Sequence, residues 1–307
     1  MRSVFMGSPE FALPVLESLA AQTTVVGVVT QPDRPSGRGR EVCPSPVKIL
    51  ADRLGLPVIQ PEKLRAPEAL VQLRAWEPEV IVVAAYGQIL RPEVLNLPGY
   101  GCLNLHASLL PRHRGASPIT AAILAGDAET GITLMQMDPG MDTGPILGQR
   151  RIPIDPFDTA ESLGRKLSLL AAETLTQLLP VYLRGEMIPR PQENALATHA
   201  PQLRKEDGRL DFQQPAALLA RKVRAYHPWP GAYITWKEQP LRILAAEADS
   251  SVVSPAPGLT AERAGFPAIY AADGLLVLRK VQPAGRRPMA GDEFFRGARD
   301  FPGHIVK

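Results

Sequence analysis

The stretch GCLNLHASLLPRHRGASPITAAILAGDAETGITLMQMDPGMDTGPIL, residues 101–147, decides how the chain folds and where its chemistry lies. It begins with an alternation in which Leu103 and Leu105 are apolar and Asn104 and His106 are polar. Side chains two apart in a strand share a face. We therefore expect a strand with one face in the core, and with an amide and an imidazole about 6.6 Å apart along the chain on the other.

The same stretch ends in a loop rich in glycine and proline, DPGMDTG at residues 138–144, after the apolar run at 132–137. The loop carries two carboxylates, Asp138 and Asp142. An amide, an imidazole and a carboxylate at strand ends are the components of a proton-transfer site with an oxyanion donor. The stretch thus predicts a catalytic site, and by itself leaves its substrate open.

The residues before this stretch predict a doubly wound, mostly parallel, Rossmann-like sheet. The runs TVVGVVT at 24–30 and VIVVAAY at 80–86 are apolar throughout, which is typical of strands buried on both faces. Segments with helical character lie between the strands. Ligands of such sheets bind beyond the carboxyl ends of the strands. We expect one crevice to be lined by residues at or just past strand ends, namely Gly7, the Tyr86–Gln88 turn and the Asn104–His106 segment.

Several function classes are excluded by missing motifs. The first strand-to-helix turn, MGSPEF, lacks the GxGxxG of a dinucleotide site, and no GxxxxGK[ST] phosphate loop occurs. The five histidines and two cysteines lack metal-ligand spacing, so we expect no metal. No apolar run approaches the ~20 residues of a membrane span, and the first residues do not resemble a signal peptide. We expect a cytoplasmic protein without membrane association.

Residues 31–46, QPDRPSGRGREVCPSP, form a long segment without periodicity that contains Arg34, Arg38 and Arg40. Long structureless loops within compact domains are often functional. Arginines between glycines favour close approach to phosphates, so we predict that this loop contacts a nucleic-acid backbone. A solvated surface loop is the alternative.

The chain changes character after a segment that resembles a linker, and we divide it at residues 1–189, 190–208 and 209–307. The last part has short β-type runs at 232–236, 241–246, 268–271 and 275–281, which predict a small β-barrel. Residues 209–307 carry a net charge of +5, against −2 for residues 1–208. This basic body favours a polyanionic partner, although a solvated basic face explains the charge equally well.

These motifs together identify a resemblance to the folate-dependent formyltransferases. The similarity rests on NLHASLLPRHRGASPI and GDAETGITLMQMDPGMDTGPIL in the central stretch. It extends through MGSPEFALPVL, TQPDRPSGRGR and AAYGQILRP to QLRKEDGRLDF, RAYHPWPGAY and QPAGRRPM, and thus covers nearly the whole chain. The resemblance implies a formyltransferase fold followed by an OB-like barrel that binds tRNA. Arg91 and His113 depart from the pattern of many relatives.

The resemblance also assigns roles to residues of this sequence. It implies that Asn104, His106 and Asp142 are catalytic. Asp138 is the competing carboxylate four residues before Asp142, and we interpret it as structural. It implies contacts to the folate from Tyr86, Gln88, Ile89, Leu90, Ser108, Leu109, Leu110 and Pro111, and contacts to tRNA from Arg34, Arg38, Arg40 and Lys205.

The implied reaction moves the formyl group of 10-formyltetrahydrofolate to the α-amine of methionine on initiator methionyl-tRNA, for translation initiation. We expect a monomer that uses no metal. The same core chemistry is compatible with glycinamide ribonucleotide or an amino-sugar nucleotide as acceptor, or with hydrolysis that releases formate. A rival of another class is a non-catalytic RNA-binding protein that uses the basic barrel.

The arginine loop generates a first prediction. Arg38→Ala should lower kcat/KM for formylation of charged tRNA and leave folate binding unchanged, because the loop is expected to contact phosphates only. Steady-state kinetics with varied tRNA, beside a folate titration of the same variant, measure both quantities. An unchanged kcat/KM for tRNA would refute the role of the loop.

Overall fold

The computed structural model describes residues 1–36 and 41–306, and they divide into two compact units. The larger unit comprises residues 1–118, 129–153 and 164–201, and the smaller unit comprises residues 119–128, 154–163 and 202–307. Within the described residues, no helix is long and apolar enough to cross a bilayer.

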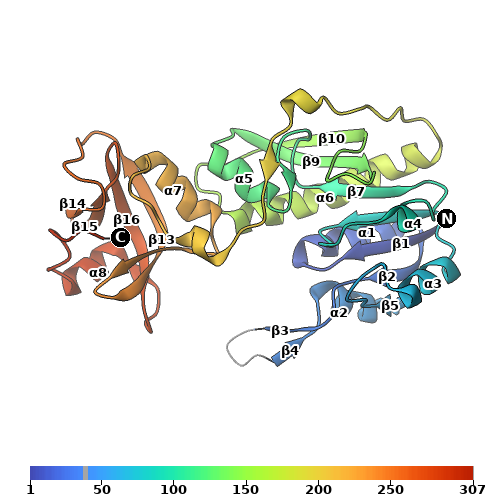
Figure 1. Ribbon diagram of the computed structural model, residues 1–307, viewed down its shortest axis with the longest axis horizontal. Helices are drawn as coiled ribbons and strands as arrows, with labels where there is room; N and C mark the ends of the chain where they lie inside the picture. The colour runs from blue at the N-terminus through green and yellow to red at the C-terminus, as the bar shows by residue number, and fades with distance from the viewer. Residues whose placement is uncertain (37–40, 307) are drawn as a thin grey trace. The chain divides into compact units, whose positions relative to one another are not determined.

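The larger unit is built on a sheet of seven described strands in the order β10-β9-β7-β6-β1-β2-β5 (Figure 1). Neighbours from β7 to β5 pair in parallel, while β9 pairs antiparallel with both β7 and β10. The expected doubly wound, mostly parallel sheet is therefore confirmed, with an antiparallel edge. The strands are β1 Arg2–Gly7, β2 Thr24–Val29, β5 Val58–Ile59, β6 Val80–Ala84, β7 Cys102–His106, β9 Glu129–Gln136 and β10 Ile146–Pro153.

The strand order reverses at the centre of this sheet. From β1 the chain moves outward to β2 and β5, and it then returns to the other side of β1 to form β6 and β7. Connections leave the carboxyl ends of β1 and β6 in opposite directions, which opens a crevice at this edge in sheets of this kind. Asn104 lies level with Val83 near the end of β6, so β7 delivers its polar residues close to the switch point.

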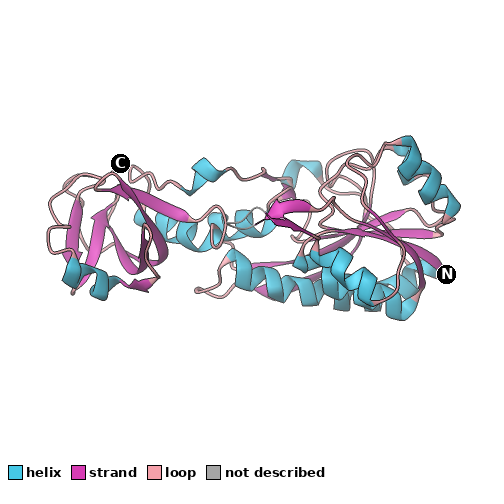
Figure 2. Ribbon diagram, turned by 90° about the horizontal axis from the view of Figure 1, so that it is seen from below, coloured by secondary structure: helices cyan, strands magenta, loops and turns pink. Residues whose placement is uncertain are grey.

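Helices cover both faces of the sheet (Figure 2). On one face, Leu73 and Trp76 at the end of α3 pack with Met6 and Val83 of the sheet. On the other face, α1 and α6 lie side by side, and the Ser18 hydroxyl of α1 donates to the Ala172 carbonyl of α6 at 3.2 Å. The helices of the larger unit are η1 Glu10–Ala12, α1 Leu13–Gln22, α2 Pro46–Arg53, α3 Pro67–Ala75, α4 Pro92–Leu95 and most of α6 Ala160–Leu183. Except for its first residue, α5 Pro118–Ala125 belongs to the smaller unit.

The segment at 31–46 is more regular than its sequence indicates. Its described residues form two short antiparallel strands, β3 Arg34–Ser36 and β4 Glu41–Cys43. Strands of three residues are too short to give a periodic pattern, which is why the sequence suggested an unstructured loop. Arg38 and Arg40 lie outside the described residues.

The base of this hairpin is anchored by Asp33. Its carboxylate accepts hydrogen bonds from the Gln60 amide at 2.5 Å and from the Lys48 ammonium at 2.6 Å. These donors favour the charged carboxylate and lower the pKa of Asp33. The hairpin therefore leaves the sheet from a fixed point beside α2.

The smaller unit contains an antiparallel sheet of six described strands that wraps around its own core (Figure 1). The helix α7 packs against it. In its core, the ring of Phe294 meets the rings of Trp236 and Phe301 edge to face, and the latter two rings are tilted against each other. All four expected strands are present, whereas β14, β17 and α8 were not anticipated. The elements are α7 Ala216–Ala225, β12 Ala232–Trp236, β13 Gln239–Asp249, β14 Thr260–Arg263, β15 Phe266–Tyr270, β16 Leu275–Pro283, β17 Met289–Ala290 and α8 Gly291–Gly297.

The packing of β7 generates a prediction about stability. Leu105 lies between Asn104 and His106 and is buried, so Leu105→Ala should lower the free energy of unfolding by about 2–5 kcal/mol. Leu169→Ala on α6, where the side chain is 60% exposed, is the matched control and should change it by at most about 0.5 kcal/mol. Urea unfolding measures both, and equal effects would contradict this account of β7.

Candidate active site

The strand β7 presents its two polar residues on one face. Leu103 and Leu105 point into the core and are buried, whereas Asn104 and His106 project from the opposite face. On the neighbouring strand β9, Met135 lies opposite Asn104 and Thr133 lies opposite His106. The alternation seen in the sequence thus survives in the folded sheet.

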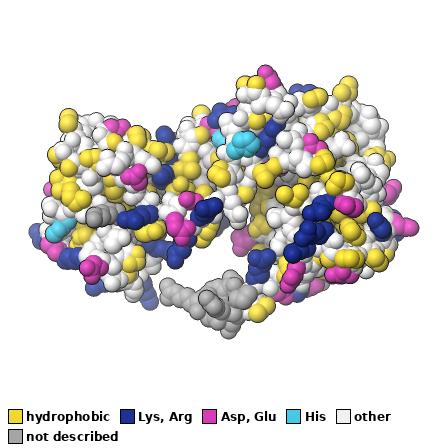
Figure 3. All heavy atoms as spheres, in the orientation of Figure 1, with side chains coloured by type: hydrophobic (Ala, Val, Ile, Leu, Met, Phe, Trp, Pro, Cys, Tyr) yellow, Lys and Arg dark blue, Asp and Glu magenta, His cyan; other side chains and the backbone are white. Residues whose placement is uncertain are grey.

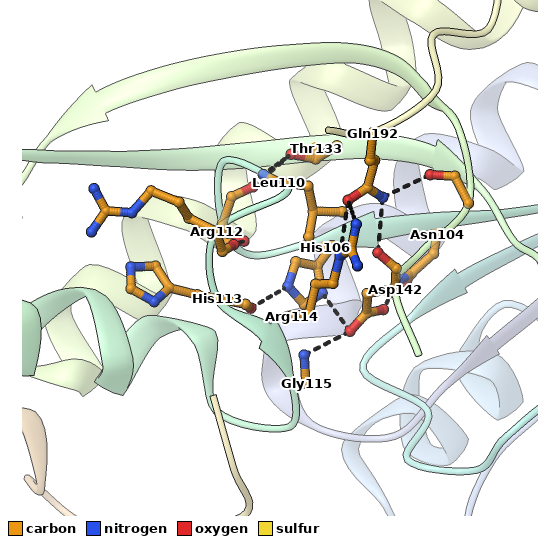
Figure 4. A network of polar contacts seen from close by, with 12 residues as sticks. Asn104, His106, Leu110, Arg112, His113, Arg114, Gly115, Thr133, Asp142 and Gln192 are labelled. Carbon is orange, nitrogen blue, oxygen red and sulfur yellow. Dashed lines mark hydrogen bonds and ion pairs between the residues drawn. The ribbon is translucent and has the colours of Figure 1, made fainter. Parts of the chain in front are cut away.

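His106 is held in one orientation (Figure 4). Its ring is only 6% exposed, and its Nε2 lies 2.9 Å from the carbonyl oxygen of His113. A carbonyl oxygen only accepts, so Nε2 carries a proton and donates it. The other nitrogen, Nδ1, therefore faces the Asp142 carboxylate, whose Oδ2 lies 3.6 Å away. A protonated His106 forms an ion pair with Asp142 in this position.

Asp142 connects the polar residues of β7 to the loop that follows β9. Its Oδ2 accepts a hydrogen bond from the Gly115 backbone N–H at 2.8 Å, and its Oδ1 accepts one from the Asn104 amide at 3.4 Å. The backbone of Asp142 has φ of 53°, in the left-handed region that non-glycine residues adopt only at a cost. The structure thus brings Asn104, His106 and Asp142 together.

Asp138 has a different place in the same loop. One of its carboxylate oxygens accepts hydrogen bonds from the Gly140 N–H at 3.0 Å and from the Thr143 hydroxyl at 2.7 Å. Both partners belong to the loop itself. Asp138 therefore shapes the loop, while Asp142 faces the histidine.

The turn after β7 is tied to β9. The Thr133 hydroxyl donates to the Ser108 carbonyl at 2.6 Å and accepts from the Leu110 N–H at 3.1 Å. The Ser108 hydroxyl donates to the Arg112 carbonyl at 2.6 Å, and the Leu110 side chain is buried. Of the expected folate contacts in this turn, only Leu109 and Pro111 are partly exposed. Ser108 and Leu110 hold the shape of the turn.

A pocket of about 440 Å³ lies beside the turn after β6, in the larger unit. Gln88 and Ile89 line it, and Ile89 is 73% exposed. The side-chain oxygen Oε1 of Gln88 accepts a hydrogen bond from the Leu64 N–H at 2.8 Å, which holds the pocket wall in place. The lining also includes three cationic side chains and one anionic side chain, together with apolar residues. These are Lys63, Arg65, Arg91, Glu93, Leu64, Leu70 and Val94.

The remaining expected folate contacts after β6 lie in the core. Tyr86 and Leu90 are both 2% exposed and pack in the cluster around Met6. Burial raises the pKa of the Tyr86 hydroxyl. Its backbone carbonyl accepts a hydrogen bond from the Gln31 amide at 3.0 Å, which links the ends of β2 and β6. These two side chains share that core cluster with Leu64 and Val94, which line the pocket.

Two of the expected tRNA contacts fall on described residues. Arg34 is exposed and donates to the Gln31 side chain at 3.3 Å, and Lys205 is exposed in η3, Lys205–Gly208, of the smaller unit. Figure 3 shows Lys and Arg side chains on the visible face of both units, with Asp and Glu side chains among them. The charge on this face is therefore mixed.

Three residues that contact this site were not anticipated. Gly115 donates its N–H to Asp142, and the side chains of Arg114 and Gln192 meet beside the same loop (Figure 4). Arg114 and Gly115 follow His106 in the central stretch, so their proximity was a usable signal. Gln192 lies fifty residues from Asp142 in a segment without periodicity, and no local pattern points to it.

In the described part of the chain, no group of side chains is arranged as a metal site.

This geometry combines a hydrogen-bond donor, an imidazole and a carboxylate at the carboxyl edge of a doubly wound sheet, which is suited to group transfer through an oxyanion. Residues 1–179 match the family model described as "Formyl transferase", and residues 202–299 match "Formyl transferase, C-terminal domain". The chain belongs to the formyl transferase family, and its enzymes are one-carbon group transferases.

The relatives of this chain identify one kind of formyl transferase. Proteins named methionyl-tRNA formyltransferase from Chloroflexus aurantiacus and Myxococcus xanthus are 50% and 47% identical to it. The alignments cover 97% and 98% of this chain, and 97% and 96% of those proteins. Among solved structures, the sugar 3N-formyl transferase WlaRD aligns with a TM-score of 0.69 at 17% identity, over 94% of this chain and 99% of its own. That last likeness establishes the fold alone.

The turn after β7 generates a prediction. Thr133→Val removes a buried hydroxyl and leaves the Leu110 N–H and the Ser108 carbonyl with fewer partners, so it should destabilise the larger unit by about 1–3 kcal/mol. Thr133→Ser keeps the hydroxyl and should retain most of that stability. Urea unfolding of both variants decides the matter, and equal losses would show that the hydroxyl is not what holds the turn.

Proposed function

We propose that this protein transfers the formyl group of 10-formyltetrahydrofolate to the α-amine of methionine on initiator methionyl-tRNA, in the cytoplasm and as a monomer. The observation that carries the proposal is the Asp142 carboxylate, which lies against both Asn104 and His106. The acceptor is inferred from relatives at 42–50% identity that are named methionyl-tRNA formyltransferase.

The donor site is the first part of the proposal. Gln88 and Ile89 line a pocket whose cationic residues, Lys63, Arg65 and Arg91, suit a ligand that carries carboxylates, as a folate does. The turn at residues 108–111 supplies further contacts from Leu109 and Pro111. The structure of WlaRD was determined in the presence of 5-N-formyl-tetrahydrofolate, which supports a folate donor in this fold.

The three polar residues have complementary roles in the proposed reaction. The neutral amine attacks the formyl carbon, the new C–N bond forms, and the formyl oxygen becomes an oxyanion to which Asn104 donates an N–H. Asp142 accepts the proton that the amine loses. His106 donates the proton that N10 takes up when its bond to the formyl carbon breaks. The Asp142 Oδ2 lies 3.6 Å from Nδ1, so the carboxylate and the imidazole are close enough to act on the same reacting groups.

The acceptor side of the proposal rests on the basic parts of the chain. Residues 1–189 form the catalytic domain, residues 190–208 the linker, and residues 209–307 the OB-like domain that binds tRNA. Arg34, Arg38 and Arg40 contact the tRNA from the loop after β2, and Lys205 contacts it from the linker. The net charge of +5 on residues 209–307 supports a polyanionic partner.

The acceptor is tested by direct comparison. Formyl transfer from 10-formyltetrahydrofolate is measured with charged initiator tRNA, with glycinamide ribonucleotide and with an amino-sugar nucleotide. We expect transfer to the tRNA only. A preference for the amino sugar would assign the chain to the activity named for WlaRD, and release of formate without an acceptor would indicate a hydrolase.

The catalytic roles generate a further prediction. Asn104→Ala, His106→Ala and Asp142→Ala should each keep the fold and lower kcat at least 100-fold. For Asn104 the expected loss of transition-state stabilisation is about 2.7–4 kcal/mol. Single-turnover kinetics on folded variants, verified by circular dichroism, provide the measurement. Near-full turnover by Asp142→Ala would overturn the assignment.

A further inference from the structure

The side chain of Gln192 makes four hydrogen bonds beside the Asp142 loop (Figure 4). Its Nε2 donates to the carbonyl oxygens of Asp142 at 2.8 Å and of Gly144 at 2.7 Å. Its Oε1 accepts from Nε of Arg114 at 3.0 Å and from Nη2 of the same residue at 2.8 Å. Since arginine only donates and carbonyl oxygens only accept, the amide has one possible orientation.

Arg114 is unusual because it is a cation that is only 5% exposed. The hydrogen-bond acceptors that the described residues give its guanidinium are amide oxygens, those of Gln192 and of Asn194, the latter at 2.9 Å. A buried cation costs free energy unless it is well solvated by the protein. Its burial at this point is therefore a reason to look for a role in the site.

The neighbours of Arg114 in the chain are the backbone groups that hold His106 and Asp142. The carbonyl of His113 accepts from His106, and the N–H of Gly115 donates to Asp142. The same segment pairs with β11, His199–Ala200, through β8, Arg114–Gly115. One short strand thus orients the imidazole, binds the carboxylate and fixes Gln192.

Asp142 needs such support, because its positive φ is a strained conformation for a non-glycine residue and persists only where the surroundings impose it. The two hydrogen bonds from Gln192 act on the backbone on either side of Thr143, and the Gly115 N–H acts on the side chain. The contacts of Gln192 are thus the ones that hold the backbone at Asp142 itself, beside the Gly115 contact to its carboxylate.

We propose that Gln192, oriented by Arg114, is a positioning residue that holds Asp142 in register with His106 for formyl transfer. This inference rests on the proposed function for its kinetic consequence only. The positioning itself concerns the geometry of the loop and is measurable without a substrate.

The decisive variant is Gln192→Glu. A carboxylate still accepts from Arg114, but it has no N–H for the carbonyls of Asp142 and Gly144 and places a negative charge against them. If Gln192 served only to solvate Arg114, this variant would be as active as the wild type. We expect instead a 10- to 100-fold fall in kcat, with KM for 10-formyltetrahydrofolate changed less than about threefold, because small misplacements of reacting groups cost rates of this order.

Two further variants complete the test. Asn194→Ala removes a hydrogen bond to Arg114 and leaves the loop contacts intact, so its kcat should stay within about threefold of the wild type. Gln192→Ala placed in the Asp142→Ala background should cause no further loss of kcat, because Gln192 acts through Asp142. An additional loss in this background, or full kcat for Gln192→Glu, would overturn the inference.

Amide hydrogen exchange separates this inference from the proposed function. In Gln192→Glu the amides of residues 138–144 should exchange at least tenfold faster than in the wild type, and in Asn194→Ala they should not. If the wild type transfers no formyl group but the exchange follows this pattern, the proposed function is wrong and the positioning role stands. If the wild type is active and exchange in Gln192→Glu is unchanged, the positioning role is wrong.

Discussion

The contact between the Asp142 carboxylate and the polar face of β7 is the interaction on which the rest of the site depends. One oxygen meets the Gly115 N–H and Nδ1 of His106, and the other meets the Asn104 amide. An anion in a partly buried position is tolerable only with such partners, because burial penalises charge. The same partners fix the direction of the carboxylate. The contacts that make the buried charge of Asp142 tolerable are therefore the same contacts that orient it for the proposed reaction.

The sheet supplies the fixed frame for this contact. Its strand order reverses beside β1, and β7 ends near the resulting crevice with its apolar residues buried on both sides of Asn104. The Asp142 loop lies between two antiparallel strands, β9 and β10, so both of its ends are held by backbone pairing. A loop held at both ends needs few additional contacts to keep one shape. Gln192 and Gly115 provide contacts of this kind.

Much of this arrangement was predictable from local patterns. Continuous apolar runs predicted the central strands, and alternation in residues 102–106 predicted which side chains would share a face. The fold class and the family resemblance were confirmed by the structure and by the relatives. The expected folate contacts lie in two different environments. Gln88 and Ile89 line a pocket, whereas Tyr86 and Leu90 lie in the core. Sequence adjacency to a site does not reveal which way a side chain points.

The sequence by itself determined the strand pattern, the absence of phosphate-binding glycine motifs and the residue types available for proton transfer. These follow from periodicity and composition, which are local properties of the chain. The residues alone offered two carboxylates, and the family resemblance favoured Asp142 over Asp138. The tertiary structure shows that Asp142 faces His106, and only the tertiary structure reveals that Gln192 reaches the loop from fifty residues away. Such choices depend on backbone direction and on contacts between distant segments, which leave no periodic trace in the sequence. For that reason the polar residues of the site could be predicted from the sequence, whereas Gln192, which holds the loop of Asp142, could not.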